Sequence, residues 1–286
     1  MTDTNLTVVI PHYNDVERLA RCLDALMPQV TPQVEVIVAD NASTQDLGDI
    51  KRRWPEVVFV TQPIKGAGPA RNAGANAATG RWLAFLDADC VPSERWVSAA
   101  QSVATKGMVF GGKVRLFDET PPPRSGAEAF ETVFAFRVRA YLAKGFLPSC
   151  QLVMARSEFA TVGEFRPEVS EDVDWSHRAT AAGLKLALSD ELEVAHPSRQ
   201  DWPALRKKWQ RLTSEGYLSD VQDTGSRAKW AAKALMMPLS VMVHAPRILR
   251  HGDLTRREKW AALNTLAKLR LCRMGWMLTQ ALTARA

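Results

Sequence analysis

The chain is poor in the features that would place it in several common protein classes. Its four cysteines, Cys22, Cys90, Cys150 and Cys272, are widely scattered among 286 residues, and no CxxC pair occurs. A structural zinc site and a redox dithiol are therefore not expected, and free thiols in a reducing cytoplasm are the simpler interpretation. Internal repeats and low-complexity tracts are also missing.

Long apolar runs are missing as well. No uncharged apolar stretch reaches about 18 residues, so an ordinary membrane-spanning helix is not predicted. The first residues, MTDTNL, contain an aspartate and no basic residue before the apolar stretch that ends at Pro11, so we expect no signal peptide. Hydrophobic residues make up 46% and charged residues 24% of the chain, which is ordinary for a globular protein with a packed core.

Positive charge is distributed unevenly. The formal net charge is +6, yet residues 201–286 hold 16 Lys and Arg against 6 Asp and Glu, whereas residues 1–200 hold 21 against 25. A basic C-terminal part indicates an anionic partner, such as a membrane surface, a nucleic acid or an acidic substrate. Because no recognised nucleic-acid-binding module occurs, we expect no nucleic-acid partner.

The N-terminal part alternates between short apolar runs and helical patterns. The apolar, β-branched runs predict strands at residues 6–10, 34–39, 57–60 and 82–86. Helices are predicted at 16–27 with Asp15 as the cap, at 46–53 and at 69–78. This alternation is typical of a parallel, doubly wound α/β sheet.

The pattern changes after residue 107. Strands are predicted at 108–116, 150–154, 184–188 and 191–195, and helices at 127–143, from Glu171, and at roughly 202–217, 227–249 and 255–283. We therefore expect two domains. Residues 1–200 form the α/β domain, and residues 201–286 form a basic, amphipathic helical extension.

Polar residues follow three of the predicted strands. They are Pro11-His-Tyr-Asn14, Asp40-Asn41 and Asp87-Ala-Asp89. Ligands of such sheets bind outside the carboxyl ends of the strands, so we expect these three clusters to converge on one crevice.

Asp87 and Asp89 are candidates for metal binding. Two carboxylates spaced in this way after a buried strand can share a divalent cation. In a reaction whose leaving group is a diphosphate, such a cation would stabilise the negative charge of that group. His196 becomes a further candidate ligand if it meets Asp89 in space. The alternative is a pair of surface aspartates in a turn and a structural histidine.

Other charged groups have two interpretations each. Glu171 and Asp172 begin a helix, where they either complement the helix dipole or supply a general base. Arg71 lies near a helix N-terminus, which suits a phosphate. Arg206 and Arg211 belong to a basic cluster that is either a solvated helix face or a clamp on a diphosphate.

Gly66-Ala-Gly68 is similar to the start of a dinucleotide-binding fingerprint. Arg71 stands where the third glycine would be, and the first strand is not followed by a glycine turn. We therefore exclude a nicotinamide dehydrogenase.

Several sequence segments, in the same order as the family's motifs, resemble glycosyltransferase family 2, whose members have the GT-A fold. They are VVIPHYND (8–15), VIVADNAST (36–44), GAGPARNAGANAATGRWLAFLDADC (66–90), PSCQLVMARSEFATVGEFRPE (148–168) and SEDVDWSHRATAAG (170–183). The resemblance covers residues 6–200. It implies a Rossmann-like, mostly parallel sheet flanked by helices.

The resemblance also implies roles for residues at the strand ends. Pro11, Tyr13 and Asn14 would line the base pocket. Asp40, with Asn41 beside it, would hydrogen-bond the nucleobase, often uracil in this family.

Further roles follow from the later phrases. Arg71 would help hold the nucleotide, Asp87 would contact the ribose or the metal, and Asp89 would ligate the metal together with His196. Asp172 would be the general base, with Glu171 as an alternative base or an acceptor contact.

The implied reaction is inverting transfer of a single sugar from a nucleotide-sugar donor, expected to be UDP-linked, to a lipid, lipid-linked or saccharide acceptor. Mg²⁺ or Mn²⁺ would sit on the diphosphate. The QxxRW motif of processive members is reduced here to Trp209-Gln210-Arg211. Two alternatives remain: a nucleotidyltransferase, which would need a glycine- and basic-rich loop where PHYND stands, and a non-catalytic nucleotide-sugar-binding or scaffold protein.

The C-terminal part mixes aromatic and leucine residues with Lys and Arg, and Pro238 and Pro246 interrupt its apolar stretch. This composition predicts helices that lie on an anionic bilayer. We expect a cytoplasmic protein that is peripheral on the inner face of the cell membrane. Helices that pack on the catalytic domain or in a homodimer are the alternative.

Overall fold

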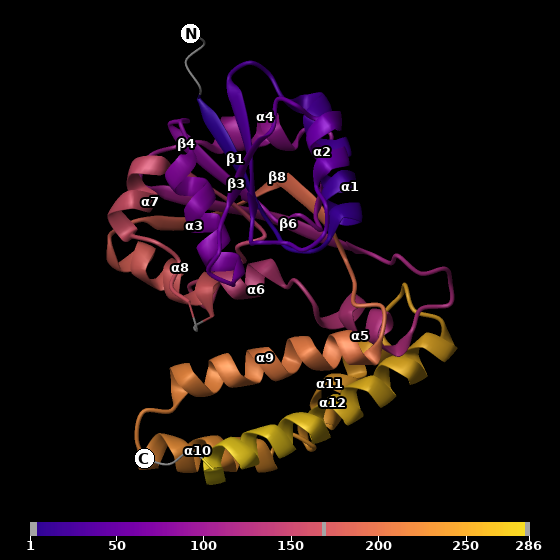
Figure 1. Ribbon diagram of the computed structural model, residues 1–286. Coiled ribbons are helices and arrows are strands. Elements are labelled where there is room, and N and C mark those ends of the chain that lie inside the picture. Colours follow the sequence, from indigo (N-terminus) through magenta and orange to yellow (C-terminus); the bar gives the residue numbers. More distant parts are fainter. Residues whose placement is uncertain (1–4, 168–169, 284–286) are drawn as a thin grey trace. The chain divides into compact units, whose positions relative to one another are not determined.

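The computed structural model describes residues 5–167 and 170–283, which form two compact units (Figure 1). Unit 1 comprises the described parts of Met1–Arg115 and Arg137–His196, and unit 2 those of Leu116–Phe136 and Pro197–Ala286. The segment Leu116–Phe136, which the sequence analysis assigned to the first domain, therefore groups with the C-terminal helices.

Unit 1 is built on a mixed sheet whose described strands follow the order β3-β2-β1-β4-β7-β6-β8-β5. The strands are β1 Leu6–His12, β2 Val34–Asp40, β3 Val58–Thr61, β4 Trp82–Leu86, β5 Val91–Pro92, β6 Met108–Phe117, β7 Gln151–Ala155 and β8 Lys185–Pro197. The first four strands are parallel. β7 pairs antiparallel with β4 and with β6, and β5 with β8. The predicted α/β class is confirmed.

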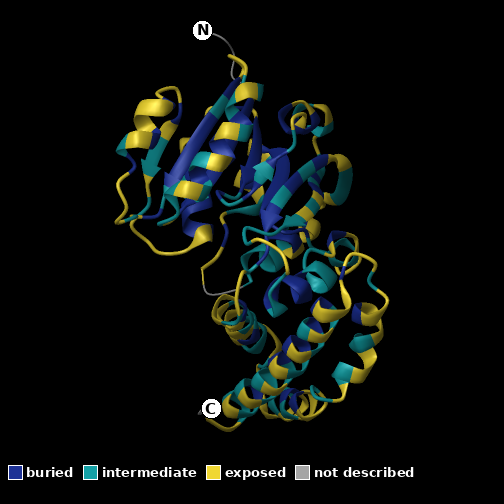
Figure 2. Ribbon diagram, turned by 90° about the vertical axis from the view of Figure 1, so that its right-hand side faces the viewer, coloured by how far each residue is buried: buried dark blue, intermediate teal, exposed yellow. Residues whose placement is uncertain are grey.

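The central strands are continuously apolar because both faces of the sheet are covered. Val8 to Ile10 of β1 and Leu83 to Leu86 of β4 have no exposed surface, and the centre of the sheet is dark blue in Figure 2. β1 continues through Pro11 to His12, past the predicted end. It can do so because β4 pairs with β1 only as far as Val9, so one side of Pro11 needs no ladder hydrogen bond.

Helices cover the sheet of unit 1. They are α1 Val16–Leu26, α2 Gly48–Arg53, α3 Ala67–Ala77, α4 Trp96–Val103, α6 Val138–Leu142, α7 Arg156–Val162 and α8 Glu171–Ala181, with the 3-10 helix η1 Met27–Gln29. α3 approaches β1 so closely that a Cβ atom on Gly74 would lie 2.3 Å from Cγ1 of Val9. Glycine is needed at this contact, which sets the depth at which Arg71, one turn earlier, lies over the sheet.

Unit 2 is helical. Its helices are α5 Gly126–Phe134, α9 Trp202–Asp220, α10 Thr224–Leu235, α11 Ser240–Leu249 and α12 Arg256–Thr283. α12 packs against the other four, and its Leu266 and Leu269 share a core with Phe130, Leu205 and Ile248. Within the described ranges, no helix is both long enough and apolar enough to span a membrane.

Four predicted elements are divided or merged in the structure. The helix predicted at 127–143 is divided into α5 and α6, because Phe136 has a left-handed φ of 46°. The helix predicted at 227–249 is divided into α10 and α11, and Pro238 lies in the break. The strands predicted at 184–188 and 191–195 are one strand, β8.

Candidate functional site

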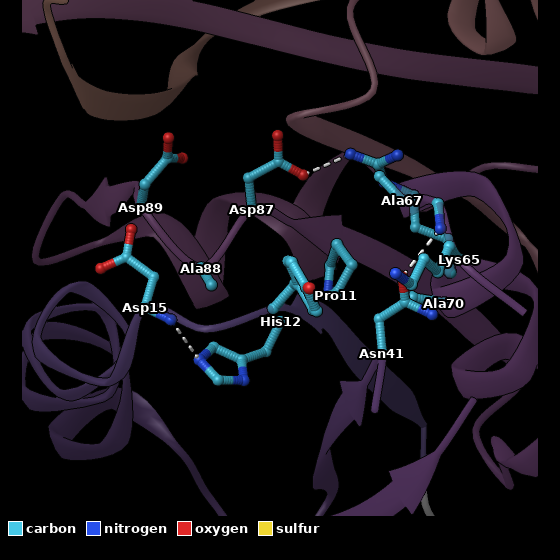
Figure 3. Close-up of a pocket in the computed structure, with 13 residues that line it drawn as sticks. Pro11, His12, Asp15, Asn41, Lys65, Ala67, Ala70, Asp87, Ala88 and Asp89 are labelled. Carbon is cyan, nitrogen blue, oxygen red and sulfur yellow. Dashed lines mark hydrogen bonds and ion pairs between the residues drawn. The ribbon is translucent and has the colours of Figure 1, made fainter. Parts of the chain in front are cut away.

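Loops at the carboxyl ends of β1, β2 and β4 line one pocket of unit 1 (Figure 3). Its volume is about 350 Å³, and its lining consists of Pro11, His12, Tyr13, Asp15, Asn41, Lys65, Gly66, Ala67, Ala70, Arg71, Asp87, Ala88 and Asp89. The structure thus brings together residues from all three polar clusters of the sequence. A cavity of this size suits a small-molecule ligand.

Arg71 of α3 is the centre of a charge network at the pocket. Its guanidinium is 2% exposed and donates to Asp87 at the end of β4 and to Glu171 in the first turn of α8. Burial alone would lower the pKa of Arg71, but the two carboxylates raise it overall. Arg71 therefore fixes the N-terminus of α8 beside the pocket.

Asp172 follows Glu171 directly and is half-buried. Burial, together with the charge of Glu171, raises the pKa of Asp172. A carboxylate with a raised pKa is the better proton acceptor near neutral pH. The side chain accepts the backbone N–H of Val173 at 2.9 Å.

Tyr141 is a neighbour of Asp172 that the sequence did not indicate. Burial raises the pKa of Tyr141, and the charge of Asp172 contributes to that shift. The ring of Tyr141 stacks on Phe146 with centroids 5.0 Å apart. No motif marked either aromatic residue, because stacking between residues five positions apart depends on the loop that follows α6.

Asp89 and His196 meet, as the metal hypothesis requires. Nε2 of His196 lies 3.4 Å from Oδ2 of Asp89, because β5 pairs with β8 and aligns Val91 with Ala195. One ligand atom each of Asp89, Cys90 and His196 lies within 4.8 Å of the others. A carboxylate beside an imidazole fits a divalent cation such as Mn²⁺. Cys90 was not predicted in this set, and Asp87 lies outside it.

Asp40 lies beside the pocket rather than in its lining. Its Oδ1 accepts the Ser43 hydroxyl at 2.5 Å and lies 3.1 Å from Nδ1 of His12. Burial opposes the change, but the hydrogen bonds from Ser43 and His12 lower the pKa of Asp40. Nε2 of His12 accepts the backbone N–H of Asp15 at 3.2 Å (Figure 3), so the proton of a neutral His12 belongs on Nδ1, facing Asp40.

The two asparagines of the predicted site, Asn14 and Asn41, accept hydrogen bonds from the backbone of neighbouring loops. Asn14 has a φ of 47°, and its Oδ1 accepts the backbone N–H groups of Thr44 and Gln45. Asn41 accepts the N–H of Gly66 at 2.8 Å (Figure 3). Asn41 lines the pocket, whereas Asn14 shapes the neighbouring loop.

Asp15 occupies the N-cap position of α1, as predicted, but its side chain makes no capping hydrogen bond. The carboxylate instead accepts Nη1 of Arg18 at 2.9 Å and lines the pocket. Lys65 is a further lining residue without a sequence signal. It lies in the loop before α3, where the sequence pattern marks only the glycines.

Comparison with known proteins identifies the family. The model of glycosyl transferase family 2 matches residues 7–159, which is more than half of the chain. The chain belongs to glycosyl transferase family 2. The resemblance in the sequence phrases is thereby confirmed.

The alignments of this family 2 glycosyltransferase with its relatives cover different shares of the two chains. Glycosyltransferase AglE of Haloferax volcanii is 28% identical over 216 residues, which are 71% of this chain and 70% of AglE. The uncharacterized glycosyltransferase YibD of Escherichia coli is 36% identical over 94 residues, 31% of this chain and 27% of YibD. Poly(ribitol-phosphate) beta-glucosyltransferase of Bacillus spizizenii is 32% identical over 137 residues, 41% of this chain and 22% of the relative. The chain thus matches under a third of the latter two.

A solved structure confirms the GT-A fold. Crystalline S. aureus TarS in complex with UDP-GlcNAc superposes with a TM-score of 0.52 and 15% sequence identity, over 93% of this chain and 80% of that one.

Two predicted residues of this family 2 glycosyltransferase lie outside unit 1. Arg206 and Arg211 are exposed on α9 of unit 2. Arg211 pairs with Glu215 one turn further along the same helix, at 3.2 Å. Their role on a diphosphate stays a prediction.

Proposed function

We propose that this family 2 glycosyltransferase moves a single sugar from a UDP-linked donor to a lipid, lipid-linked or saccharide acceptor, with inversion at the anomeric carbon. The observation that carries the proposal is the bridge from Asp87 in the pocket through Arg71 to Glu171. It brings the carboxylate pair of α8 to the edge of the pocket. The UDP-GlcNAc held by TarS supports the choice of UDP.

The nucleoside would occupy the pocket at the carboxyl ends of β1 and β2. Tyr13 is 51% exposed there, so its ring is accessible to a stacking base. Pro11 and Asn41 would line the base, and Lys65 would face the phosphates. Asp40 and Asn14 would affect base binding indirectly. Asp40 holds His12 in place, and Asn14 holds the loop after β2.

The chemistry of Asp89 and His196 fits a divalent cation, Mg²⁺ or Mn²⁺. When bound, the cation would neutralise charge on the leaving diphosphate. Arg71 donates to Oδ1 of Asp87. Asp87 would therefore contact the ribose or this cation through its other carboxylate oxygen.

Asp172 would accept the proton of the acceptor hydroxyl. Its raised pKa favours this role, and Arg71 forms its ion pair with the adjacent Glu171. The deprotonated oxygen would attack the anomeric carbon on the face opposite the diphosphate, which inverts the configuration.

Unit 2 would attach the protein to the anionic inner face of the cell membrane. The support is a run of exposed apolar side chains where α10 ends and α11 begins. This α10–α11 patch consists of Leu235, Met236, Leu239, Met242 and Val243, each at least half exposed. Apolar residues within a basic helical unit are typical of interfacial attachment.

Calorimetric titration with UDP and GDP, with and without Mn²⁺ or Mg²⁺, tests the donor site. We expect metal-dependent binding of UDP that is lost in Asp89→Ala. Asp190→Ala is the matched control, because Asp190 is an exposed aspartate of unit 1 paired with Arg139 on the surface. Preference for GDP would change the donor, and absence of nucleotide binding under all conditions would favour the scaffold alternative.

A further inference from the structure

Two arginines of α12 have no acidic partner among the described residues. Nε of Arg270 and Nε of Arg273 are both enclosed and form no hydrogen bond. Nη1 of Arg270 lies 3.9 Å from Sδ of Met237. The guanidinium of Arg273 lies 4.8 Å from the ring centre of Trp209 on α9.

Neither arginine is neutralised by its surroundings. Burial lowers the pKa of Arg270, and burial together with the charge of Arg270 lowers the pKa of Arg273 to about 10. Because a guanidinium group is not deprotonated in proteins, both side chains remain charged. Residues three positions apart lie on one helix face, so two positive charges stand side by side there, on half-buried side chains whose Nε atoms are enclosed. Such an arrangement is unfavourable unless something supplies the missing negative charge.

A third unpaired donor lies at the same place. Nε1 of Trp209 is enclosed and has no hydrogen-bond partner in the described structure, and its ring contacts Arg273. Guanidinium and indole groups donate and do not accept hydrogen bonds. The three residues thus form a donor-only cluster, whose complement is an anion rich in acceptor oxygens.

The neighbours of this cluster indicate which anion. Met237, the contact of Arg270, lies between Met236 and Pro238 in the break that separates α10 from α11. Met236 and Leu239 belong to the exposed α10–α11 patch. A ligand that reaches both features carries a negative head and an apolar tail, and the fork of an arginine matches phosphate oxygens.

We propose that Arg270, Arg273 and Trp209 form a binding site for a phosphate group, supplied by the headgroup of an anionic lipid whose tails contact the α10–α11 patch. The lipid as source rests on the membrane attachment proposed above. The phosphate site itself lies in unit 2 and is independent of the donor pocket.

The test compares two substitutions that preserve charge. The full chain is sedimented with vesicles of phosphatidylcholine, with and without phosphatidic acid, as wild type, Arg273→Lys and Arg257→Lys. Arg257 is an exposed arginine on the same helix. We expect binding only with phosphatidic acid, a loss of about tenfold in Arg273→Lys because lysine lacks the planar fork, and no loss in Arg257→Lys. Equal binding by all three proteins would mean diffuse attraction and would overturn the lipid headgroup as the source of the phosphate.

A second measurement separates the sources of phosphate and checks folding. Inorganic pyrophosphate should raise the Tm of the wild type more than that of Arg273→Lys or Arg270→Lys, since a ligand that binds only the folded state stabilises it and the donor pocket is the same in all three proteins. A rise in Tm without vesicle binding keeps the phosphate site and assigns it to a soluble phosphate. If neither pyrophosphate nor phosphatidic acid distinguishes the variants, the site is refuted. No turnover is measured, so a failure of the donor site would leave these results intact.

Discussion

Arg71 of unit 1 and Arg273 of unit 2 each have an enclosed Nε that lacks a hydrogen-bond partner among the described residues, but their electrostatic surroundings are opposite. Two carboxylates hold Arg71 and raise its pKa. An aromatic ring and another arginine adjoin Arg273, and burial together with the charge of Arg270 lowers its pKa. The charge of Arg71 is balanced without a ligand, and Arg71 serves to position α8. Arg273 has no such carboxylate among the described residues, so an anionic ligand could balance its charge.

The largest expected effect tests the carboxylate that Arg71 positions. Asp172→Asn keeps the shape of the side chain and removes the proton acceptor, so we expect kcat to fall by about 10²–10⁴. UDP binding should be unchanged, which calorimetry can check. Asp190→Asn is the control and should retain full activity. Unchanged kcat in Asp172→Asn would remove the base role from this residue.

The comparison itself is tested by replacing each arginine with methionine. Arg71→Met leaves Asp87 and Glu171 unpaired and should lower the free energy of unfolding by about 3 kcal/mol. Arg273→Met removes a charge that has no partner, so its effect should stay within about 1 kcal/mol or be stabilising. Urea unfolding of both variants measures the difference. Equal losses would show that Arg273 is as well compensated as Arg71.

The two units should also respond oppositely to pH. The folded-state pKa of Asp172 is raised, so its stabilising contribution exists below its unfolded pKa and is lost as pH rises through the folded one. Burial would raise the pKa of Glu131 in unit 2, but Lys208 and Arg199 lower it. The stability from Glu131 therefore exists above its unfolded pKa and is lost as pH falls through the folded one.

Near neutral pH, Asp172→Asn should therefore raise the Tm and Glu131→Gln should lower it. The acid limb of kcat/KM for the wild type should lie at higher pH than an ordinary aspartate would give, since Asp172 must be ionised to act as base. A pH series of thermal unfolding and of initial rates measures both effects. Shifts of the same sign in the two variants would contradict the assignment.

The smallest effect on stability is expected at the surface of α9. Arg211→Gln removes an exposed pair with Glu215, which should change the free energy of unfolding by at most about 0.5 kcal/mol. Because the fold is unaffected, any weakening of UDP binding in Arg211→Gln or Arg206→Gln would support the predicted diphosphate clamp. Unchanged UDP affinity in both would restrict donor binding to unit 1.

The parts of the fold that follow local rules could be predicted from the sequence. β4 has the predicted bounds, because a fully buried strand is a continuous apolar run. The polar residues at the strand ends lie around one pocket because parallel strands place their carboxyl ends at one edge. β5 was missed, since two residues carry no periodicity and their pairing with β8 is a long-range contact.

The candidate site was less predictable where side chains choose partners across the fold. The sequence marked Arg71 and Glu171 separately, but their ion pair joins residues 100 positions apart. Asp40 was expected at the base, and the structure engages it with His12 and Ser43. The sequence also could not predict that Arg270 and Arg273 lack acidic partners, because charged residues at helical spacing usually indicate a solvated helix face.

Unit 2 is assembled from two separated stretches of chain, and this has a consequence for synthesis. α5 packs against α12, and Arg124 near its start donates to Glu258 across 134 positions. At about 5–20 residues per second, α5 leaves the ribosome on the order of ten seconds before α12 exists to cover it. Phe130 and its apolar neighbours stay uncovered for that time, so the nascent chain should depend on chaperones more than the finished enzyme does.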